Sequence, residues 1–159
     1  MMAIAAVRIR GTVLARQTVV DTLKMLRLTR ANHCVILADT PSTRGMLRKV
    51  KDYVTWGEVT PQIIARVLLR RGHVEGDEGL NDAYVKAHSK YSSIWDFTQA
   101  LSKGEASPRD VEGLKPVLRL HPPLKGYKSV KRPYGAGGDL GYRGKEIDNL
   151  LTRMLGVEK

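Results

Sequence analysis

A basic, glycine-rich segment near the end of the chain has the composition best suited to contact with a polyanion. Between residues 121 and 145 it holds six basic residues, six glycines, three tyrosines and one acid, Asp139. Glycine lets backbone N–H groups approach a phosphate, lysine and arginine neutralise it, and tyrosine stacks on an unpaired base. The alternative is a flexible surface loop that is basic because the whole protein is basic. Six like charges in a free loop repel one another, so we favour polyanion contact. The candidate contacts are Lys125, Lys128, Lys131, Arg132, Tyr134, Arg143 and Lys145.

A second basic set lies in segments that are predicted to be ordered. It comprises Arg8, Arg10, Arg27, Arg30, Arg44, Arg48, Lys49 and Lys51. In a helix over 41–51, Arg44, Arg48 and Lys51 are spaced i, i+4 and i+7 and share a face, where like charges destabilise the free helix by about 0.2–0.5 kcal/mol per pair. A solvated helix face is the alternative, but such faces normally carry interleaved acids, and Asp52 is the only one nearby. An anionic partner would reverse the sign of the repulsion, so binding is again favoured.

Signals for catalysis or metal binding are weak. The histidines, at positions 33, 73, 88 and 121, have no metal-ligand spacing such as i, i+4 on one helix. Cys34 lies inside an apolar run and is more typical of a buried, inert thiol than of a nucleophile. The segment 135–140 (GAGGDL) lacks the third glycine of a dinucleotide-binding loop, and no predicted strand leads into it. We therefore predict no catalytic residue, no metal site and no cofactor.

Composition agrees with a polyanion-binding protein of one domain. The 159 residues include 27 Lys and Arg against 16 Asp and Glu, which gives a net charge of +11 and a pI of about 10.0. A pI above 9 with clustered basic residues is typical of nucleic-acid binders, although a solvated lysine-rich surface is the alternative. No apolar run approaches the roughly 18–20 residues that span a bilayer, and the short apolar start is broken by Arg8, so neither a membrane segment nor a signal peptide is expected. A single cysteine excludes an internal disulfide and suggests a reducing compartment.

The elements that must position the second basic set are predicted over the first 57 residues. Residues 3–10 alternate as a strand, with one buried face and with Arg8 and Arg10 on an outer basic face. A helix is predicted from a capping box at Thr18 to about residue 28, a buried strand over 34–37, a helix from Pro41 to 51 and a strand over 53–56. This β-α-β-α-β order predicts a two-layer α+β unit with the helices on one side of the sheet.

The rest of the chain is predicted to be mostly helical. Helices are expected over 61–72, 81–89 and 94–104, with either Trp95 or Phe97 buried, followed by a single turn at 107–110. A strand is expected near 117–120. The basic loop spans 121–145, and a C-terminal helix covers 146–155 with an apolar stripe at i, i+3, i+4 and i+7. The loop cannot build a core, so we expect it to be mobile in the free protein and ordered on RNA.

Several segments resemble one ribosomal protein family. The stretches 22–35 (TLKMLRLTRANHCV) and 40–50 (TPSTRGMLRKV) are similar to the universal large-subunit ribosomal protein family numbered thirty, whose eukaryotic counterpart is numbered seven. The stretches 51–58 (KDYVTWGE) and 116–123 (PVLRLHPP), with the loop 138–144, resemble the longer archaeal version. The eukaryotic form carries a long basic N-terminal arm, whereas this sequence begins at the first strand, which favours the archaeal form. The resemblance implies a universal core over 1–58 and an archaeal and eukaryotic extension over 59–159.

The resemblance also implies a fold and a function. The fold would be a β-α-β-α-β core with an antiparallel sheet, related to the ferredoxin-like fold. The protein would be a non-enzymatic 50S constituent that binds 23S rRNA near the 5S rRNA, contacts neighbouring ribosomal proteins and supports assembly and translation. It would be ribosome-bound in the cytoplasm, without a membrane partner or small-molecule substrate. By position, the implied rRNA contacts are Arg27, Arg30, His33, Arg44, Lys49 and Lys51, to which the residue patterns add Arg8, Arg10, Arg48 and the loop residues.

Two alternatives remain open on the sequence. A free-standing RNA-processing or assembly factor would share the charge but would occur away from the mature ribosome. An enzyme that uses His33 and Cys34 is the second alternative, although the sequence offers no activated partner for that thiol.

Overall fold

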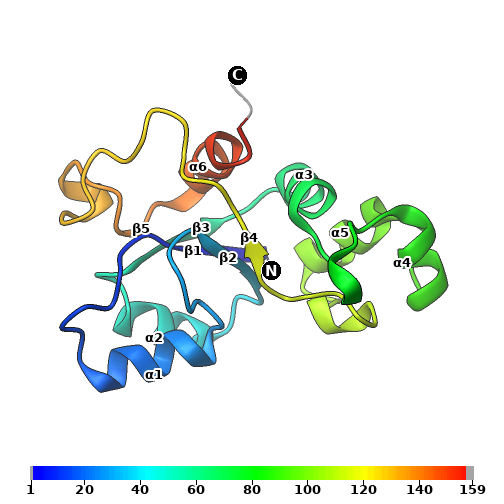
Figure 1. The fold of residues 1–159 in the computed structure, drawn as a ribbon, viewed down its shortest axis with the longest axis horizontal. Helices are drawn as coiled ribbons and strands as arrows, with labels where there is room; N and C mark the ends of the chain where they lie inside the picture. Colours follow the sequence, from blue (N-terminus) through cyan, green and yellow to red (C-terminus); the bar gives the residue numbers. More distant parts are fainter. Residues whose placement is uncertain (1, 157–159) are drawn as a thin grey trace.

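A five-stranded sheet forms the centre of the computed structural model, which describes residues 2–156 (Figure 1). The strands are β1 (Ile4–Arg8), β2 (His33–Leu37), β3 (Val54–Glu58), β4 (Leu118–Arg119) and β5 (Gly141–Tyr142), in the spatial order β4-β2-β1-β3-β5. The pairs β1–β2, β1–β3 and β2–β4 are antiparallel, whereas β3–β5 is parallel. The predicted α+β class is therefore present. β5 was not predicted, because two residues carry no periodicity.

Two helices cover one face of the sheet, α1 (Gln17–Met25) and α2 (Pro41–Lys49) (Figure 1). α2 begins as its sequence predicts, because the Thr40 side chain accepts a hydrogen bond from the Thr43 backbone N–H at 3.1 Å. The capping box predicted at Thr18 is wrong, since α1 begins one residue earlier without a side-chain cap. The core on this face contains Ile4, Ala6, Leu23, Leu26, Leu28, Val35, Leu47, Val50, Val54 and Trp56.

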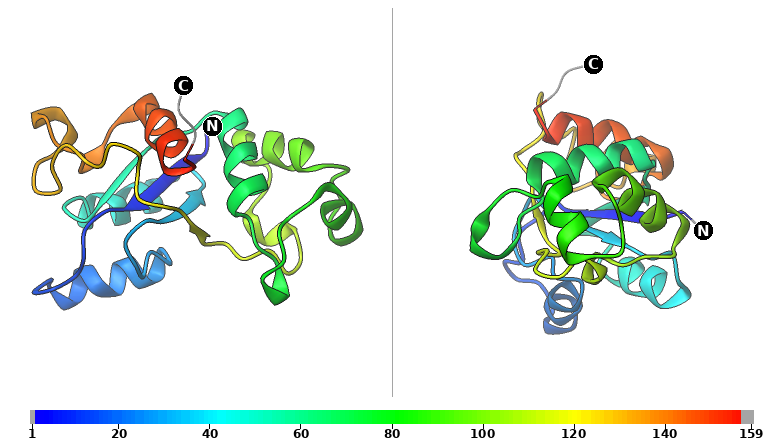
Figure 2. Two further views of the ribbon diagram at one scale, coloured as in Figure 1. Left: turned by 45° about the horizontal axis from the view of Figure 1, so that its top comes forward. Right: turned by 90° about the vertical axis from the view of Figure 1, so that its right-hand side faces the viewer.

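The opposite face is covered by the rest of the chain. α3 (Pro61–Arg71) and α6 (Ile147–Met154) lie side by side over the sheet, and α4 (Asp82–His88) and α5 (Ile94–Lys103) pack outward from α3 (Figure 2). Short 3-10 turns lie at Glu75–Asp77, Pro108–Asp110, Tyr134–Ala136 and Gly144–Glu146. We call residues 59–116 the helical lobe. One core joins it to the sheet, with Val7 and Cys34 in the same cluster as Phe97 and Leu150. Phe97 is the aromatic residue that α5 buries, while Trp95 is 45% exposed.

The predicted outer basic face of the first strand is wrong. β1 is the middle strand, and both of its faces are covered, because Ala5 and Val7 belong to one core and Ile4 and Ala6 to the other. All five of its residues are buried. Arg8 is only 5% exposed, whereas Arg10 lies beyond the end of the strand and is exposed. Alternation predicts a buried face but does not reveal whether the other face is also covered, because that depends on residues far along the chain.

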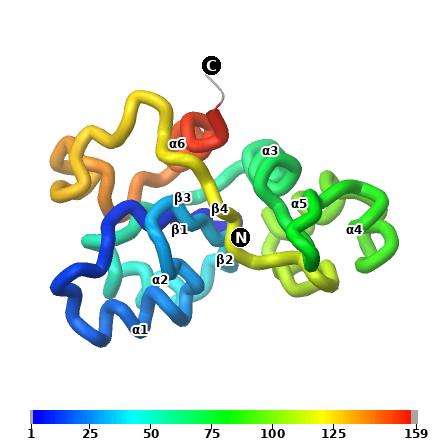
Figure 3. Tube along the Cα trace, viewed as in Figure 1, coloured from blue at the N-terminus to red at the C-terminus, as the bar shows by residue number. Residues whose placement is uncertain are grey.

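The basic loop, residues 121–145, runs back along the sheet from β4 to β5, as its yellow and orange trace shows in Figure 3. The part of the chain after β3 thus supplies both edge strands of the sheet and the helices α3 to α6. No helix among the described residues is long and apolar enough to cross a membrane.

Candidate nucleic-acid interface

Most of the predicted contact residues lie at the surface. Twelve of the sixteen have exposed side chains, namely Arg10, Arg27, Arg30, Arg44, Arg48, Lys49, Lys51, Lys125, Lys128, Lys131, Arg132 and Lys145. His33 and Tyr134 are half-buried, and Arg8 and Arg143 are buried. The structure therefore divides the predicted set into side chains that can reach a partner directly and side chains that lie behind that surface.

A group of cationic residues surrounds His33 at the start of β2. Arg119 pairs with His33 in the β2–β4 register, and Arg30 precedes it in the chain. Burial lowers the pKa of His33, and the charges of Arg119, Arg30 and Arg8 lower it further. Its Nδ1 atom is buried without a hydrogen-bond partner among the described residues. This group, which we call the His33 cluster, gathers positive charge and one unpaired ring nitrogen, and within residues 2–156 no carboxylate forms an ion pair with it.

Arg8 supports the His33 cluster from beneath. Its Nε donates to the carbonyl of Arg10 at 3.0 Å and its Nη1 donates to the carbonyl of Leu28 at 3.1 Å. In the described part of the chain no carboxylate pairs with it, and burial lowers its pKa. A buried cation without a counter-ion raises the local potential, which favours an anion at the surface above it.

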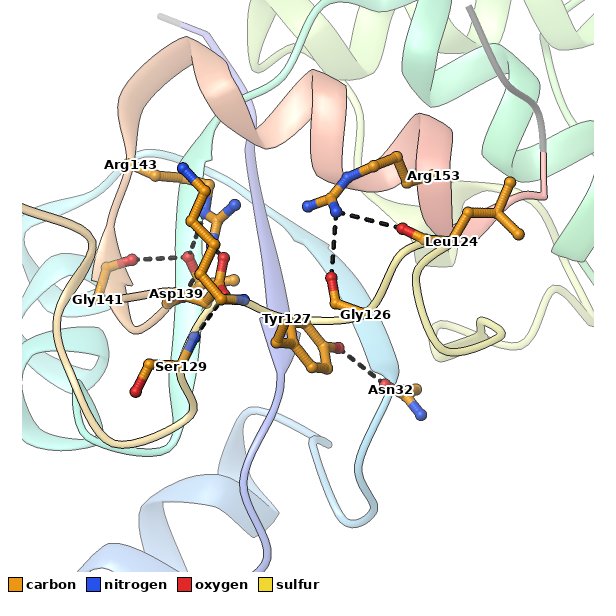
Figure 4. A network of polar contacts seen from close by, with 11 residues as sticks. Asn32, Leu124, Gly126, Tyr127, Ser129, Asp139, Gly141, Arg143 and Arg153 are labelled. Carbon is orange, nitrogen blue, oxygen red and sulfur yellow. Dashed lines mark hydrogen bonds and ion pairs between the residues drawn. The ribbon is translucent and has the colours of Figure 1, made fainter. Parts of the chain in front are cut away.

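Within the basic loop, Asp139 organises the backbone (Figure 4). This carboxylate is buried and accepts hydrogen bonds from the backbone N–H groups of Lys128 and Ser129, the latter at 3.3 Å. It also pairs with Arg143, whose Nη2 lies 3.0 Å from Oδ1. The one acid of the loop is therefore its internal anchor, and the loop's cations Lys128, Lys131 and Arg132 remain exposed to solvent.

Arg143 is part of this anchor and does not lie at the surface of the loop, where the sequence reasoning placed it. Its side chain is 3% exposed, and its Nε donates to the hydroxyl of Thr55 on β3 at 2.8 Å. Two further contacts tie the loop down (Figure 4): the Tyr127 hydroxyl donates to Asn32 at 2.9 Å, and Arg153 of α6 donates to the carbonyl of Gly126 at 3.1 Å. Burial raises the pKa of Tyr127 to about 12, so it remains a donor at neutral pH.

The outer face of α2 meets the β3–β5 edge at a hollow. Arg44 and Arg48 line it from α2, as their spacing predicts, and Tyr142 lines it from β5. α2 ends at Lys49, so helical spacing does not govern the position of Lys51. The sequence reasoning missed Asp39, whose carboxylate holds Arg44 through two bonds of 2.5 and 2.6 Å, and that interaction lowers the pKa of Asp39. It also missed Tyr142 and Arg119, although Tyr142 lies next to the predicted contact Arg143 and Arg119 lies in the strand expected near 117–120.

Charge is divided unevenly between the helical lobe and the rest of the molecule. The lobe, residues 59–116, holds eight basic and eight acidic residues, so the whole net charge of +11 lies outside it. The His33 cluster, the α2 face and the basic loop all belong to the charged part. An excess that served only solubility would have no reason to avoid one third of the chain.

No arrangement suited to catalysis is found among residues 2–156. No group of three or more His, Cys, Asp or Glu side chains is placed to hold a metal ion there. Cys34 is fully buried, and burial raises its pKa to about 12, so its thiol stays protonated at neutral pH. A protonated, inaccessible thiol cannot act as the nucleophile that the enzymatic alternative requires.

Comparison with known proteins decides the family. A family model described as ribosomal protein L30p/L7e matches residues 4–54, which run from β1 to the start of β3. The large ribosomal subunit protein uL30 of Methanoregula boonei is 57% identical over 151 residues, covering 94% of this chain and 98% of the relative. The uL30 proteins of Methanoculleus marisnigri and Archaeoglobus fulgidus are 53% and 49% identical over the same share of both chains. The chain belongs to this family.

Family membership confirms the resemblance seen in the sequence, including its archaeal character, because these relatives are archaeal and extend over nearly the whole chain. It also confirms that the chain is not an enzyme, since the family consists of structural ribosomal proteins. The exposed basic surfaces described above are therefore features of a ribosomal protein and not of a catalytic cleft.

Proposed function

We propose that this protein is a structural constituent of the large ribosomal subunit that binds 23S rRNA near the 5S rRNA and supports subunit assembly and translation. It is ribosome-bound in the cytoplasm and contacts neighbouring large-subunit proteins. The relatives named above are large ribosomal subunit proteins. The observation that carries the proposal is the charge division, because the whole net charge of +11 lies outside the helical lobe, in the part of the chain that holds the sheet, its first two helices and the basic loop.

The contacts in this proposal act mainly through phosphates. The twelve exposed basic residues, with His33 and Tyr134, form the contact surface, to which we add Arg119 because it is exposed beside His33. Arg8 and Arg143 lie behind this surface and hold it in place through carbonyl and carboxylate bonds. Phosphate contacts position a protein on RNA, while RNA shape and unstacked bases provide selectivity.

We further infer that residues 1–58 form the universal core, related to the ferredoxin-like fold, and that residues 59–159 are the archaeal and eukaryotic extension. The family model supports this boundary, because its match ends at residue 54, within β3. The extension covers the second face of the sheet and adds β4 and β5 at its two edges. It therefore completes the core and does not stand apart as a separate domain.

Fractionation of ribosomes on a sucrose gradient tests the function itself. The proposal predicts one copy per mature large subunit, retained through a wash at moderate salt. A protein that is found only in precursor particles, or only in the unbound fractions, would instead be the assembly factor that the charge alone also permits.

The salt dependence of rRNA binding tests the assignment of the α2 face as a contact surface. Each phosphate contact contributes about 0.7–0.9 to the slope of log K against log salt concentration. Arg44→Ala or Lys51→Ala is therefore expected to leave the fold intact and to lower the slope on a 23S rRNA fragment by somewhat less than one unit. Lys103→Ala, in the neutral helical lobe, is the matched control and should leave the slope unchanged. An equal effect of all three variants would contradict the assignment of the α2 face.

A further inference from the structure

The hollow between α2 and the β3–β5 edge has the form of a small binding site. Its volume is about 310 Å³, at the lower end of the roughly 300–1,000 Å³ that is typical of ligand pockets. The residues that line it are Ile4, Arg44, Arg48, Trp56, Glu58 and Tyr142. A shallower hollow of about 520 Å³ shares Arg44 and Arg48 and extends to Thr40 and Pro41 along α2. We call the first space the Tyr142 hollow.

The backbone on both sides of Tyr142 is bound to β3, and the hydrogen bond from its hydroxyl to Glu58 holds the ring. The hydroxyl of Thr55 donates to the carbonyl of Gly141 at 2.8 Å, and the N–H of Arg143 donates to the carbonyl of Trp56 at 2.9 Å. Gly57 permits this approach, since a Cβ atom there would lie 1.9 Å from the carbonyl oxygen of Gly144. The Tyr142 side chain is nevertheless 56% exposed. A large ring that is held rigidly and left open to solvent is suited to stacking on a partner.

The polar groups of the hollow are also held in place. Both carboxylate oxygens of Glu58 lie 2.8 Å from the Tyr142 hydroxyl, which leaves acceptor capacity on each oxygen. Arg44 uses two of the five N–H donors of its guanidinium group to bind Asp39. No carboxylate of the described residues pairs with Arg48, which stands exposed at the junction of the two hollows. The site thus offers a stacking surface, a carboxylate and one uncompensated cation.

We propose that the Tyr142 hollow binds one unstacked RNA nucleotide, with its base on the Tyr142 ring and its phosphate at Arg48. The inference deepens the proposed function, on which it rests, by giving this face a base-reading site in addition to phosphate contacts. Base stacking on aromatic side chains is the usual way in which proteins hold single-stranded nucleotides. The shallower hollow beside Arg48 gives the neighbouring sugar and phosphate a path along α2.

Glu58 makes guanine the expected base. Guanine presents two adjacent donors, the N1–H and the exocyclic amine, which match the two oxygens of one carboxylate. Uracil presents one N–H between two carbonyl oxygens, and those oxygens would face the negative charge of Glu58. One good pair at a base edge typically discriminates by about fivefold or more. We therefore expect guanosine monophosphate to bind at least about fivefold more tightly than uridine monophosphate.

Tryptophan fluorescence provides a direct measurement. The chain has two tryptophans, and Trp95 lies in the helical lobe at 45% exposure, so Trp95→Phe leaves Trp56 as the reporter inside the hollow. The full-length Trp95→Phe protein is titrated with each of the four ribonucleoside monophosphates at millimolar concentrations. The expected result is saturable quenching of Trp56, and guanosine monophosphate should reach half-saturation at a lower concentration than the other three nucleotides.

Three substitutions in the same background separate the parts of the site. Tyr142→Ala should weaken the binding of all four nucleotides by about fivefold or more, as removal of a stacking ring does. Glu58→Gln should remove the preference for guanosine while leaving the other three nucleotides nearly unchanged. Arg48→Ala should weaken the binding of all four nucleotides equally. Lys103→Ala is the control and should leave every affinity unchanged. Circular dichroism confirms that each variant is folded.

The outcomes distinguish this inference from the proposed function. A Trp56 signal that responds to none of the four nucleotides, in a protein that still binds rRNA, overturns the inference and leaves the function standing. Saturable binding of nucleotides by a protein that is absent from large subunits supports the hollow and contradicts the function. If hydrogen exchange at residues 141–145 slows only when other ribosomal proteins join the rRNA complex, the occupant is a protein, and the inference is again overturned.

Discussion

The helical lobe and the sheet with its basic loop share one hydrophobic core but differ completely in charge. The lobe holds equal numbers of acidic and basic residues, and the rest of the chain holds the whole excess of +11. Both parts fold against the same strands, so neither folding nor burial requires the excess. The lobe thus serves as an internal reference for an ordinary surface of this protein. Compared with the neutral lobe, the basic regions carry the excess positive charge that suits a polyanion.

The lobe and the basic loop also use ion pairs differently. In the lobe, Lys115 pairs with Asp77, whose side chain is 69% exposed. In the basic loop, Arg143 pairs with Asp139 at 3% and 4% exposure, and the same carboxylate accepts two backbone N–H groups. An exposed pair contributes little to stability, whereas a buried pair that loses one partner leaves an uncompensated charge. The loop thus depends on one acid to hold its repelling cations together.

The largest expected effect is therefore the loss of Asp139. Asp139→Ala should lower the free energy of unfolding by about 3–5 kcal/mol, because it leaves Arg143 buried without a counter-ion and two backbone N–H groups without an acceptor. Asp77→Ala is the matched control in the lobe and should have little effect. Urea denaturation followed by circular dichroism measures both changes. Similar losses for the two variants would show that the regions do not differ in this respect.

Hydrogen exchange in the same loop addresses its mobility. Its composition predicts that residues 121–145 are mobile in the free protein, whereas the bonds to Asp139 protect the amide protons of Lys128 and Ser129. We expect these two protons to exchange slowly without RNA and the nearby amide of the exposed Arg132 to slow only on RNA. Rapid exchange of all three in the free protein would favour the mobile loop.

A second effect, smaller over any one pH unit, concerns the burial of Cys34 between the lobe and the sheet. Cys34 is buried where the lobe covers β2, and burial raises its pKa from 9.0 to about 12. Above pH 9 the unfolded thiol loses its proton while the folded thiol keeps it. The free energy of unfolding therefore falls as pH rises from 9 towards 12, by about 1.4 kcal/mol per pH unit from this group.

Comparison with Cys34→Ala isolates that contribution, because other groups titrate in both proteins and the difference in slope belongs to the thiol. The burial of Cys34 also predicts that a thiol reagent at pH 8 labels this residue only after denaturation. Rapid labelling of the native protein would show that the lobe opens away from the sheet, and the shared core would then no longer unite the two regions.

Local signals in the sequence predicted most of the elements. Thr40 followed by Pro41 predicts the start of α2, and Ser93 and Gly104 mark the two ends of α5, where Gly104 adopts a left-handed conformation. The features that the sequence did not reveal depend on distant partners. β5 exists because Thr55 and Trp56 bind its backbone, and Arg8 is buried because segments far along the chain cover both faces of β1.

The same distinction applies to the candidate interface. Composition and spacing predicted the exposed cations, because a charged side chain on a helix face or in a loop remains at the surface unless something buries it. They misplaced Arg143, whose burial depends on Thr55 and Asp139 together, and they missed Asp39 and Tyr142. Pairing between residues such as Glu58 and Tyr142, which are 84 positions apart, has no local signature.

The smallest expected effect compares one histidine from each region. His33 and His73 both have a buried Nδ1 without a partner among the described residues. Around His33, Arg8 on β1, Arg30 before β2 and Arg119 on β4 all lower its pKa, after burial itself. His73 lies in the neutral lobe and provides the matched control.

A phosphate that binds at the His33 cluster offsets those positive charges, so bound rRNA should raise the pKa of His33 towards its ordinary value or above it. By linkage, the affinity for rRNA then increases as pH falls from 8 to 6, by at most about tenfold for each pH unit. His33→Gln should remove this dependence, and His73→Gln should leave it intact. Histidine titration by NMR, with and without the rRNA fragment, measures the change in pKa itself. If the pKa of His33 is unchanged on RNA, no phosphate lies at the cluster, and the uncompensated charge of Arg8 must be balanced in some other way.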